Sequence, residues 1–137
     1  MGQPSNGISV DATTGTQLGT FLADVVPAIE STAGFFLRSG TLSAKSLSDN
    51  STLWSFQGDG GLVSSPIVVN QAVMIGSSSG QLYGLDATTG AQLWTTNAGG
   101  AISGGTNNVI SGLAAGDGLL VVPAGTTVSA YILSTNP

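Results

Sequence analysis

The sequence of 137 residues predicts an all-β fold made of repeated units of four short antiparallel strands, and three observations lead to this prediction. The peptide GQLYGLDATTGAQLW at 80–94 joins two apolar segments through a polar turn, and a close copy, ISVDATTGTQL, occurs at 8–18. The chain holds 21 glycines and is 41% hydrophobic but only 7% charged, which is typical of many short strands and tight turns. No segment shows the sustained period of 3.6 residues that would predict a long helix.

The polar turn at 86–90 contains the residue types that a tight reversal requires. Asp86 can accept hydrogen bonds from backbone N–H groups two or three residues further on, and Gly90 can adopt a positive φ without steric cost. Trp94 follows the turn and brings a large apolar side chain whose N–H needs a partner. We therefore interpret Asp86, Gly90 and Trp94 as structural residues. A role for Asp86 as a metal ligand or base would need a second carboxylate or a histidine nearby, and the local sequence offers neither.

The repeat has the length and strand content of one β-propeller blade. Within 60–99 the sequence predicts strands at 65–69, 72–75, 82–85 and 92–96, and Trp54 precedes Trp94 by about one period of 40 residues. A blurred copy of the motif, LSAKSLSDNSTLW, occupies 42–54. The predicted organisation is one continuous domain: an N-terminal tail at 1–7, a partial blade at 8–24, blades at 25–59 and 60–99, and an incomplete blade with a C-terminal tail at 100–137.

This count predicts about three blade equivalents and an incomplete ring. A closed propeller has about four or more blades. The chain begins on a third strand at 8–11 and ends on another third strand at 128–133, so it cannot close on itself with a whole number of blades. An open stack exposes strand edges and apolar faces. We therefore expect the propeller to be completed by other copies of the chain or by blades outside this sequence.

The motif also carries a family resemblance. The stretch Gly84-Leu-Asp86-Ala-Thr-Thr89-Gly90-Ala-Gln-Leu-Trp94 resembles the tryptophan-docking motif of PQQ-like (quinoprotein alcohol dehydrogenase-like) β-propeller repeats. The resemblance implies that the Trp of one blade packs against the turn of its neighbour. The implied structural-motif residues are Asp11, Gly15, Trp54, Asp86, Gly90 and Trp94.

Two places depart from that pattern. Gly19 stands where the first copy would have its Trp, which predicts a weaker first junction between blades. The turn at 49–52 lacks the Gly and is expected to be built differently.

Composition excludes several classes of function. The net charge is −5 and the only cations are Arg38 and Lys45, so the chain has no basic footprint for nucleic acid. The longest apolar run, at 119–122, is too short for membrane insertion. There is no His or Cys and one Glu, Glu30. The family's enzymes hold a quinone and a calcium ion, but this chain offers no cluster for either. We expect no catalytic, metal or cofactor-binding residue and no cofactor. The segments Asp59-Gly60-Gly61 and Asp117-Gly118 are interpreted as hairpin turns.

The favoured interpretation is a non-catalytic scaffold or interaction module of an extracytoplasmic protein. The low lysine content and the abundant Ser, Thr and Gly resemble periplasmic, cell-surface or secreted bacterial proteins, and 1–7 is not a signal peptide, so an export signal would lie outside this chain. The expected partners are the chain itself, other propeller blades, or a peptide or protein. Two alternatives stay open: a self-assembling structural subunit that forms a ring or filament, and a fragment of a PQQ-dependent dehydrogenase.

Overall fold

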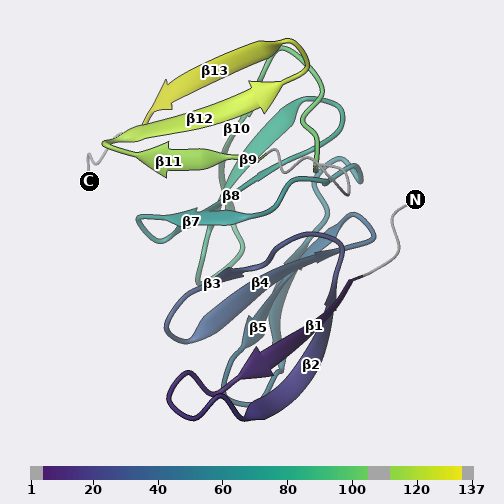
Figure 1. The fold of residues 1–137 in the computed structure, drawn as a ribbon. Helices are drawn as coiled ribbons and strands as arrows, with labels where there is room; N and C mark the ends of the chain where they lie inside the picture. The colour runs from purple at the N-terminus through teal and green to yellow at the C-terminus, as the bar shows by residue number, and fades with distance from the viewer. Residues whose placement is uncertain (1–4, 105–111, 134–137) are drawn as a thin grey trace.

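The computed structural model describes residues 5–104 and 112–133, and every regular element within them is a β-strand. These strands form four separate antiparallel sheets, and no sheet closes on itself. The sheets follow one another in chain order and are stacked face to face, from the N-terminal sheet at the bottom of Figure 1 to the C-terminal sheet at the top. The all-β prediction of propeller blades in an incomplete ring is therefore confirmed.

We name the four sheets by their position in the chain. The N-terminal half-blade pairs β1 (Ser5–Val10) with β2 (Gln17–Ala23). The first blade contains β3 (Ala28–Ile29), β4 (Ala33–Arg38), β5 (Thr41–Ser46) and β6 (Thr52–Phe56). The second blade contains β7 (Ile67–Val69), β8 (Ala72–Gly76), β9 (Gln81–Asp86) and β10 (Gln92–Asn97). The C-terminal blade contains β11 (Ala114–Gly116), β12 (Leu119–Ala124) and β13 (Thr127–Ile132).

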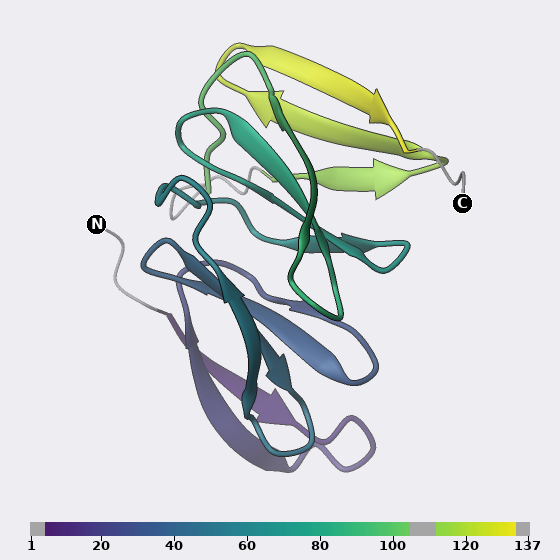
Figure 2. The same cartoon turned by 180° about the vertical axis from the view of Figure 1, so that it is seen from behind.

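Apolar layers between consecutive sheets hold the stack together. One layer joins the first and second blades and includes Phe35, Leu42, Ile75 and Leu85, all fully buried. A second layer joins the second and C-terminal blades through side chains such as Leu82 and Leu120. Alternation along each strand sends one set of side chains to each neighbour, so both faces of the second blade are apolar and buried. Seen from behind in Figure 2, the fourth strands β6 and β10 run along the near side of the stack.

The strands differ from the predicted ranges mainly at their starts. The first strands, predicted at 26–29 and 65–69, are shorter: β3 begins at Ala28 and β7 at Ile67, each after a proline, which has no N–H to donate to a ladder. In contrast, β1 begins earlier than predicted, at Ser5, because Ser5 to Gly7 pair with β2. Regular strand pairing therefore includes part of the segment 1–7 that the sequence predicts as a tail. For the last blade the sequence predicts a first strand at 111–115, of which residue 111 lies outside the described residues.

Candidate functional site

The turn between β9 and β10 has the local hydrogen bonds that its sequence predicts. The carboxylate of Asp86 accepts hydrogen bonds from the backbone N–H groups of Thr88 (2.9 Å) and Thr89 (2.8 Å). The N–H of Gly90 donates to the carbonyl of Asp86 at 2.8 Å, and Gly90 has a φ of 76°. Because the two backbone N–H groups stabilise the charged carboxylate, the pKa of Asp86 lies below its ordinary value. These hydrogen bonds all form within five residues, and we call the resulting turn a platform.

Trp54 of the first blade covers this platform on the second blade. Its indole N–H donates to the carbonyl of Ala87 at 3.0 Å. A Cβ added to Gly90 would lie 2.5 Å from the Cδ2 atom of Trp54, so the ring rests directly on the glycine. The ring also packs at 5.7 Å from that of Phe35 on its own blade. Trp54 thus contacts both blades, and only a residue without a side chain fits beneath it.

The N-terminal half-blade contains the same platform without a tryptophan on it. Asp11 accepts hydrogen bonds from the N–H groups of Thr13 (2.7 Å) and Thr14 (3.0 Å), and these bonds hold its pKa below the ordinary value. Gly15 has a φ of 74° and donates to the carbonyl of Asp11 at 2.8 Å. No described heavy atom lies within 4 Å of a Cβ built on Gly15. The two turns are therefore alike in backbone and differ in what covers them.

The turn between β5 and β6 corrects one prediction. Its sequence lacks the glycine and was expected to be built differently, but the backbone bonds are the same. The N–H of Asn50 donates to the carbonyl of Ser46 at 2.9 Å, as Gly90 does to Asp86. Asn50 has a φ of 62°, because asparagine tolerates the left-handed region better than most residues. Ser46 takes the place of the capping aspartate, and its hydroxyl accepts the N–H of Ser48 at 3.2 Å.

Trp94 is oriented like Trp54 but has a different environment. It lies opposite Gly84 on β9 and packs into the apolar layer shared with the C-terminal blade. The position of a receiving turn, after β13 and beyond Leu133, lies outside the described residues. With Tyr131 and Leu133, Trp94 lines a hollow of about 570 Å³. The docking of Trp94 onto a neighbouring turn therefore stays a prediction.

The N-terminal half-blade and the first and second blades share a β-bulge that the sequence analysis did not predict. The ladders pair Gln17 with Val10, Thr52 with Lys45 and Gln92 with Leu85, and in each the register then shifts by one residue. The bulged residue is a leucine each time, and it is exposed each time: Leu18, Leu53 and Leu93. The repeated leucine in TQL, TLW and QLW was the available signal. The bulge also sets which side of the sheet Trp54 and Trp94 face.

The first junction between blades uses phenylalanine where the motif has no tryptophan. Gly19 pairs with Ser9 and contributes no side chain to the junction. The ring of Phe21 instead covers Gly7, where an added Cβ would lie 2.1 Å from it. Phe21 also packs against Phe36 of the first blade with ring centroids 5.3 Å apart. The sequence pattern did not predict this contact, because Phe21 lies two residues beyond the motif position.

Asp59 has a role that the sequence did not reveal. It was interpreted as part of a hairpin turn, but it lies in the connection from β6 to β7. Its carboxylate accepts hydrogen bonds from the hydroxyls of Ser77 (2.7 Å) and Ser79, and from the N–H of Gly61 (3.0 Å). These bonds, the one from Ser79 above all, lower the pKa of Asp59. The carboxylate thereby fastens the connection to the loop between β8 and β9. The pair Asp117-Gly118, in contrast, does form the two-residue turn between β11 and β12.

These carboxylates predict a loss of stability in acid. Asp11, Asp49, Asp59 and Asp86 all have pKa values lowered from 3.8 in the folded chain, so their stabilisation is complete above about pH 4 and is lost as pH falls through the lowered pKa values. The thermal midpoint should be flat from pH 7 to 5 and should fall below pH 4, modestly because these carboxylates are exposed to solvent. Asp59→Asn should reduce the acid-sensitive part of that fall. An unchanged midpoint at pH 2.5 would contradict the assignment.

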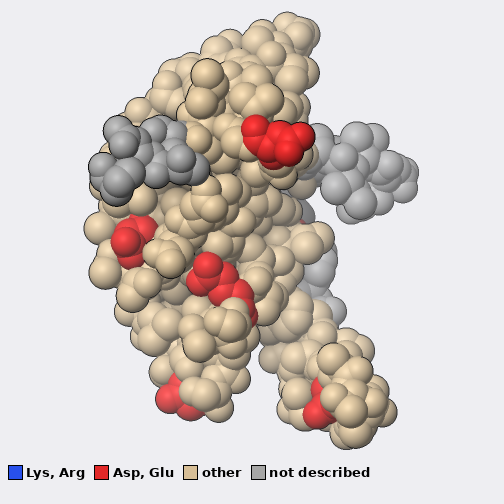
Figure 3. Space-filling view, turned by 90° about the vertical axis from the view of Figure 1, so that its left-hand side faces the viewer, with Lys and Arg blue, Asp and Glu red and all other residues tan. Residues whose placement is uncertain are grey.

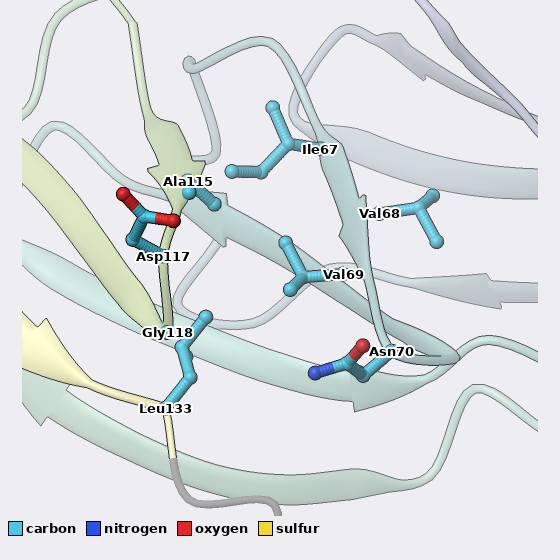
Figure 4. A pocket seen from close by; sticks show the side chains of 9 residues that line it. Ile67, Val68, Val69, Asn70, Ala115, Asp117, Gly118 and Leu133 are labelled. Carbon is cyan, nitrogen blue, oxygen red and sulfur yellow. The ribbon is translucent and has the colours of Figure 1, made fainter.

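A hollow of about 510 Å³ lies between the first strands of the second and C-terminal blades, as Figure 4 shows. Polar and apolar surface contribute about equally to its walls, with Ile67, Val69, Asn70 and Leu133 around it, and the side chain of Val68 points away from it. Asp117 supplies the one carboxylate among the lining residues. One carboxylate and the amide of Asn70 do not supply the several convergent polar groups that orient a small substrate.

The described residues do not fit the calcium and quinone that enzymes of the resembled family hold. Calcium requires six to eight oxygen ligands, usually from several carboxylates. Within residues 5–104 and 112–133, no three His, Cys, Asp or Glu side chains group closely enough to hold a metal ion. The carboxylates of Asp11, Asp59 and Asp86 are already occupied by N–H and hydroxyl donors. The described part of the chain also has no helix that is long and apolar enough to cross a membrane.

Comparison with known proteins agrees with this geometry. A family model described as outer membrane protein assembly factor BamB matches residues 6–135, almost the whole chain. The chain belongs to this family of PQQ-like β-propellers. A curated relative of this PQQ-like β-propeller, the BamB of Shewanella oneidensis, is 39% identical over 56 residues, which is 41% of this chain and 14% of that protein.

Solved structures share the fold at low identity. The crystal structure of BamB from Moraxella catarrhalis matches 95% of this PQQ-like β-propeller and 41% of its own chain, with a TM-score of 0.70 and 20% identity. A quinohemoprotein alcohol dehydrogenase from Pseudomonas putida matches 81% of this chain and 19% of its own, with a TM-score of 0.64 and 16% identity. The present chain thus spans less than half the length of these proteins, and the likeness to the two structures shows the fold alone.

Proposed function

We propose that this PQQ-like β-propeller is a non-catalytic scaffold that binds a peptide or protein. The observation that carries the proposal is the use made of its carboxylates. Asp11 and Asp86 cap backbone N–H groups of turns, and Asp59 fastens one loop to another. Carboxylates can serve in proton transfer or metal binding, but here they hold turns and loops in place. Loops held on a fixed scaffold are a common basis for recognition.

The matched relatives support a protein partner. The family model and the Shewanella oneidensis relative both carry the name of an assembly factor of outer membrane proteins. By analogy we place this chain in an extracytoplasmic protein, periplasmic, cell-surface or secreted. The face shown in Figure 3 displays scattered Asp and Glu side chains and no visible Lys or Arg. Such a surface repels nucleic acid and anionic membranes and suits a neutral or basic protein segment.

Two other functions are compatible with the fold and the surface. One is a fragment of a PQQ-dependent dehydrogenase, since a quinohemoprotein alcohol dehydrogenase shares the fold; its active-site residues would then lie outside this sequence. The exposed apolar faces of the two terminal sheets favour a self-assembling subunit of a ring or filament.

Titration with PQQ and Ca²⁺ tests whether this chain itself holds a cofactor site. The fluorescence of Trp54 and Trp94 and the absorption of the quinone report binding, and reduction of an artificial electron acceptor by ethanol reports activity. The scaffold proposal expects no saturable change in any of these signals. It also expects that a displayed peptide library yields ligands that the free peptide displaces competitively. Saturable quinone binding by this chain would overturn the proposal.

A further inference from the structure

The two terminal sheets each present an apolar face that the rest of the chain does not cover. On the C-terminal blade, the face turned away from the second blade is formed by β12 and β13 and exposes Leu119, Val128 and Ile132. Val128 is 70% exposed and Ile132 is 85% exposed. On the half-blade, the face turned away from the first blade exposes Ile8 (60%) and Val10 (49%). We call these the C-terminal face and the N-terminal face.

The internal repeat shows what covers each face elsewhere in the chain. The turn at 11–15 matches the turn at 86–90 in sequence and bonds, so Ile8 and Val10 hold the positions of Tyr83 and Leu85. Tyr83 is 6% exposed and Leu85 is 0% exposed, because the first blade covers them. The N-terminal face is therefore one half of a contact that is complete between the first and second blades.

The C-terminal face is the other half of that contact. The pairs Pro123–Val128 and Val121–Ala130 correspond to Gly76–Leu82 and Met74–Gly84 in the second blade. Val128 thus holds the position of Leu82, which is 0% exposed under the C-terminal blade. Inside the chain, a face of this kind is always covered by the opposite face of the next sheet.

The turn at 11–15 likewise lacks the contact that its counterpart at 86–90 receives from a preceding blade. At 86–90 the same sequence carries Trp54 of the preceding blade, whereas no described atom lies within 4 Å of a Cβ on Gly15. Exposure of a bulged leucine does not indicate a missing partner, since Leu53 and Leu93 are exposed on internal blades as well. Only residues whose internal counterparts are buried point to a missing neighbour.

Neither face is protected against association. Proteins usually blunt an exposed sheet with charged side chains, lysine above all. The strands β1, β2, β12 and β13 contain no Lys, Arg, Asp or Glu. Among the described residues, β1 pairs only with β2 and β13 pairs only with β12. The other edge of β1 and of β13 is therefore open.

We propose that the occupant of each face is a second copy of this chain, docked head to tail. The C-terminal face of one copy stacks on the N-terminal face of the next, with Val128 and Ile132 against Ile8 and Val10. The two faces differ, so the contact is heterologous and repeats until it closes into a ring or continues as a filament. The inference rests on the proposed scaffold function, in which contacts between blades and not a catalytic centre are the functional feature. It names a second copy of this chain as the first protein partner.

Two single variants, each disabling one face, test the proposal. Ile8→Asp disables the N-terminal face and Val128→Asp the C-terminal face, and both residues are exposed, so neither change should unfold the chain. Leu53→Asp is the matched control, an exposed leucine on β6 that lies on neither face. In native mass spectrometry and mass photometry, the unaltered chain and Leu53→Asp should form multiples of 13.5 kDa. Each face variant alone should be a monomer, with an apparent affinity weakened at least tenfold.

Mixing the two face variants decides the direction of docking. Each retains one intact face, so an equimolar mixture should form a dimer of one copy of each and nothing larger. A face-to-face contact between like faces would instead leave one of the variants as associated as the unaltered chain, and that result would overturn the proposal. An unaltered chain that stays monomeric at 100 µM would overturn it too. Neither result alters the quinone titration, so failure of this inference and failure of the scaffold function are distinguishable.

Discussion

Trp54→Ala is expected to lower the free energy of unfolding by about 3 kcal/mol, the size of effect found when a large aromatic is truncated in a packed site. The indole ring packs on Phe35 and on Gly90, and its N–H donates to the carbonyl of Ala87, so the change removes contacts with two blades at once. Unfolding in urea, followed by circular dichroism, measures the loss.

Two further variants divide that loss into its parts. Trp54→Phe keeps most of the ring contact and removes the N–H, so it should cost about 1 kcal/mol, the net value of one hydrogen bond. Trp94→Ala should cost less than Trp54→Ala, because within the described residues Trp94 has no hydrogen bond to a neighbouring blade and borders a hollow of about 570 Å³. If Trp54→Ala cost less than 1 kcal/mol, the joint between the first and second blades would not depend on this residue.

Gly90→Ala is expected to cost about 3 kcal/mol, whereas Gly15→Ala should cost about 1 kcal/mol. Both glycines have nearly the same φ, 76° and 74°, so both variants incur the penalty of about 1 kcal/mol for an L-residue in the left-handed region. Only at Gly90 does the new methyl group collide with Trp54, whose Cδ2 atom lies 2.5 Å from it. The difference between the two variants measures the contact between the ring and the turn.

The comparison has an internal control. In the Trp54→Ala background the collision is absent, so Gly90→Ala should cost about 1 kcal/mol, like Gly15→Ala, and the double-mutant cycle gives the coupling. All variants are best compared in the Val128→Asp background, where the proposed contact with a second copy cannot stabilise the turn at 11–15. Equal costs for Gly90→Ala and Gly15→Ala would show that Trp54 does not rest on Gly90 in solution.

The contact between Trp54 and the turn at 86–90 shows which features can be predicted from the sequence and which cannot. Asp86, Gly90 and Trp94 are interpreted from the sequence as structural residues, because aspartate and glycine suit a tight turn and tryptophan needs a packing surface and a partner for its N–H. The same reasoning failed at 49–52, where the missing glycine suggested a different turn. Asn50 adopts the left-handed conformation instead, and the backbone bonds are kept. A motif read as a fixed set of residue types misses substitutions that satisfy the same backbone requirement.

Contacts between residues far apart in the sequence were harder to predict from the sequence. Asp59 binds Ser77 and Ser79, about twenty residues further along the chain, and nothing in the sequence around Asp59 indicates these partners. Phe21 meets Phe36 because β2 and β4 lie on neighbouring sheets. The register shift that exposes Leu18, Leu53 and Leu93 is likewise set by pairing across two strands.

The sequence by itself determined the repeated unit and the shape of its turns. The hydrogen bonds of a turn such as 86–90 form within five residues, so the residue types and their spacing are sufficient to specify it. Only the tertiary structure decided that two identical turns have different surroundings. Gly90 lies under Trp54 and Gly15 is uncovered, although both follow the same DATT segment. The reason is physical: burial of a turn depends on the sheet that stacks on it, and that sheet comes from another part of the chain or, as we propose, from another copy.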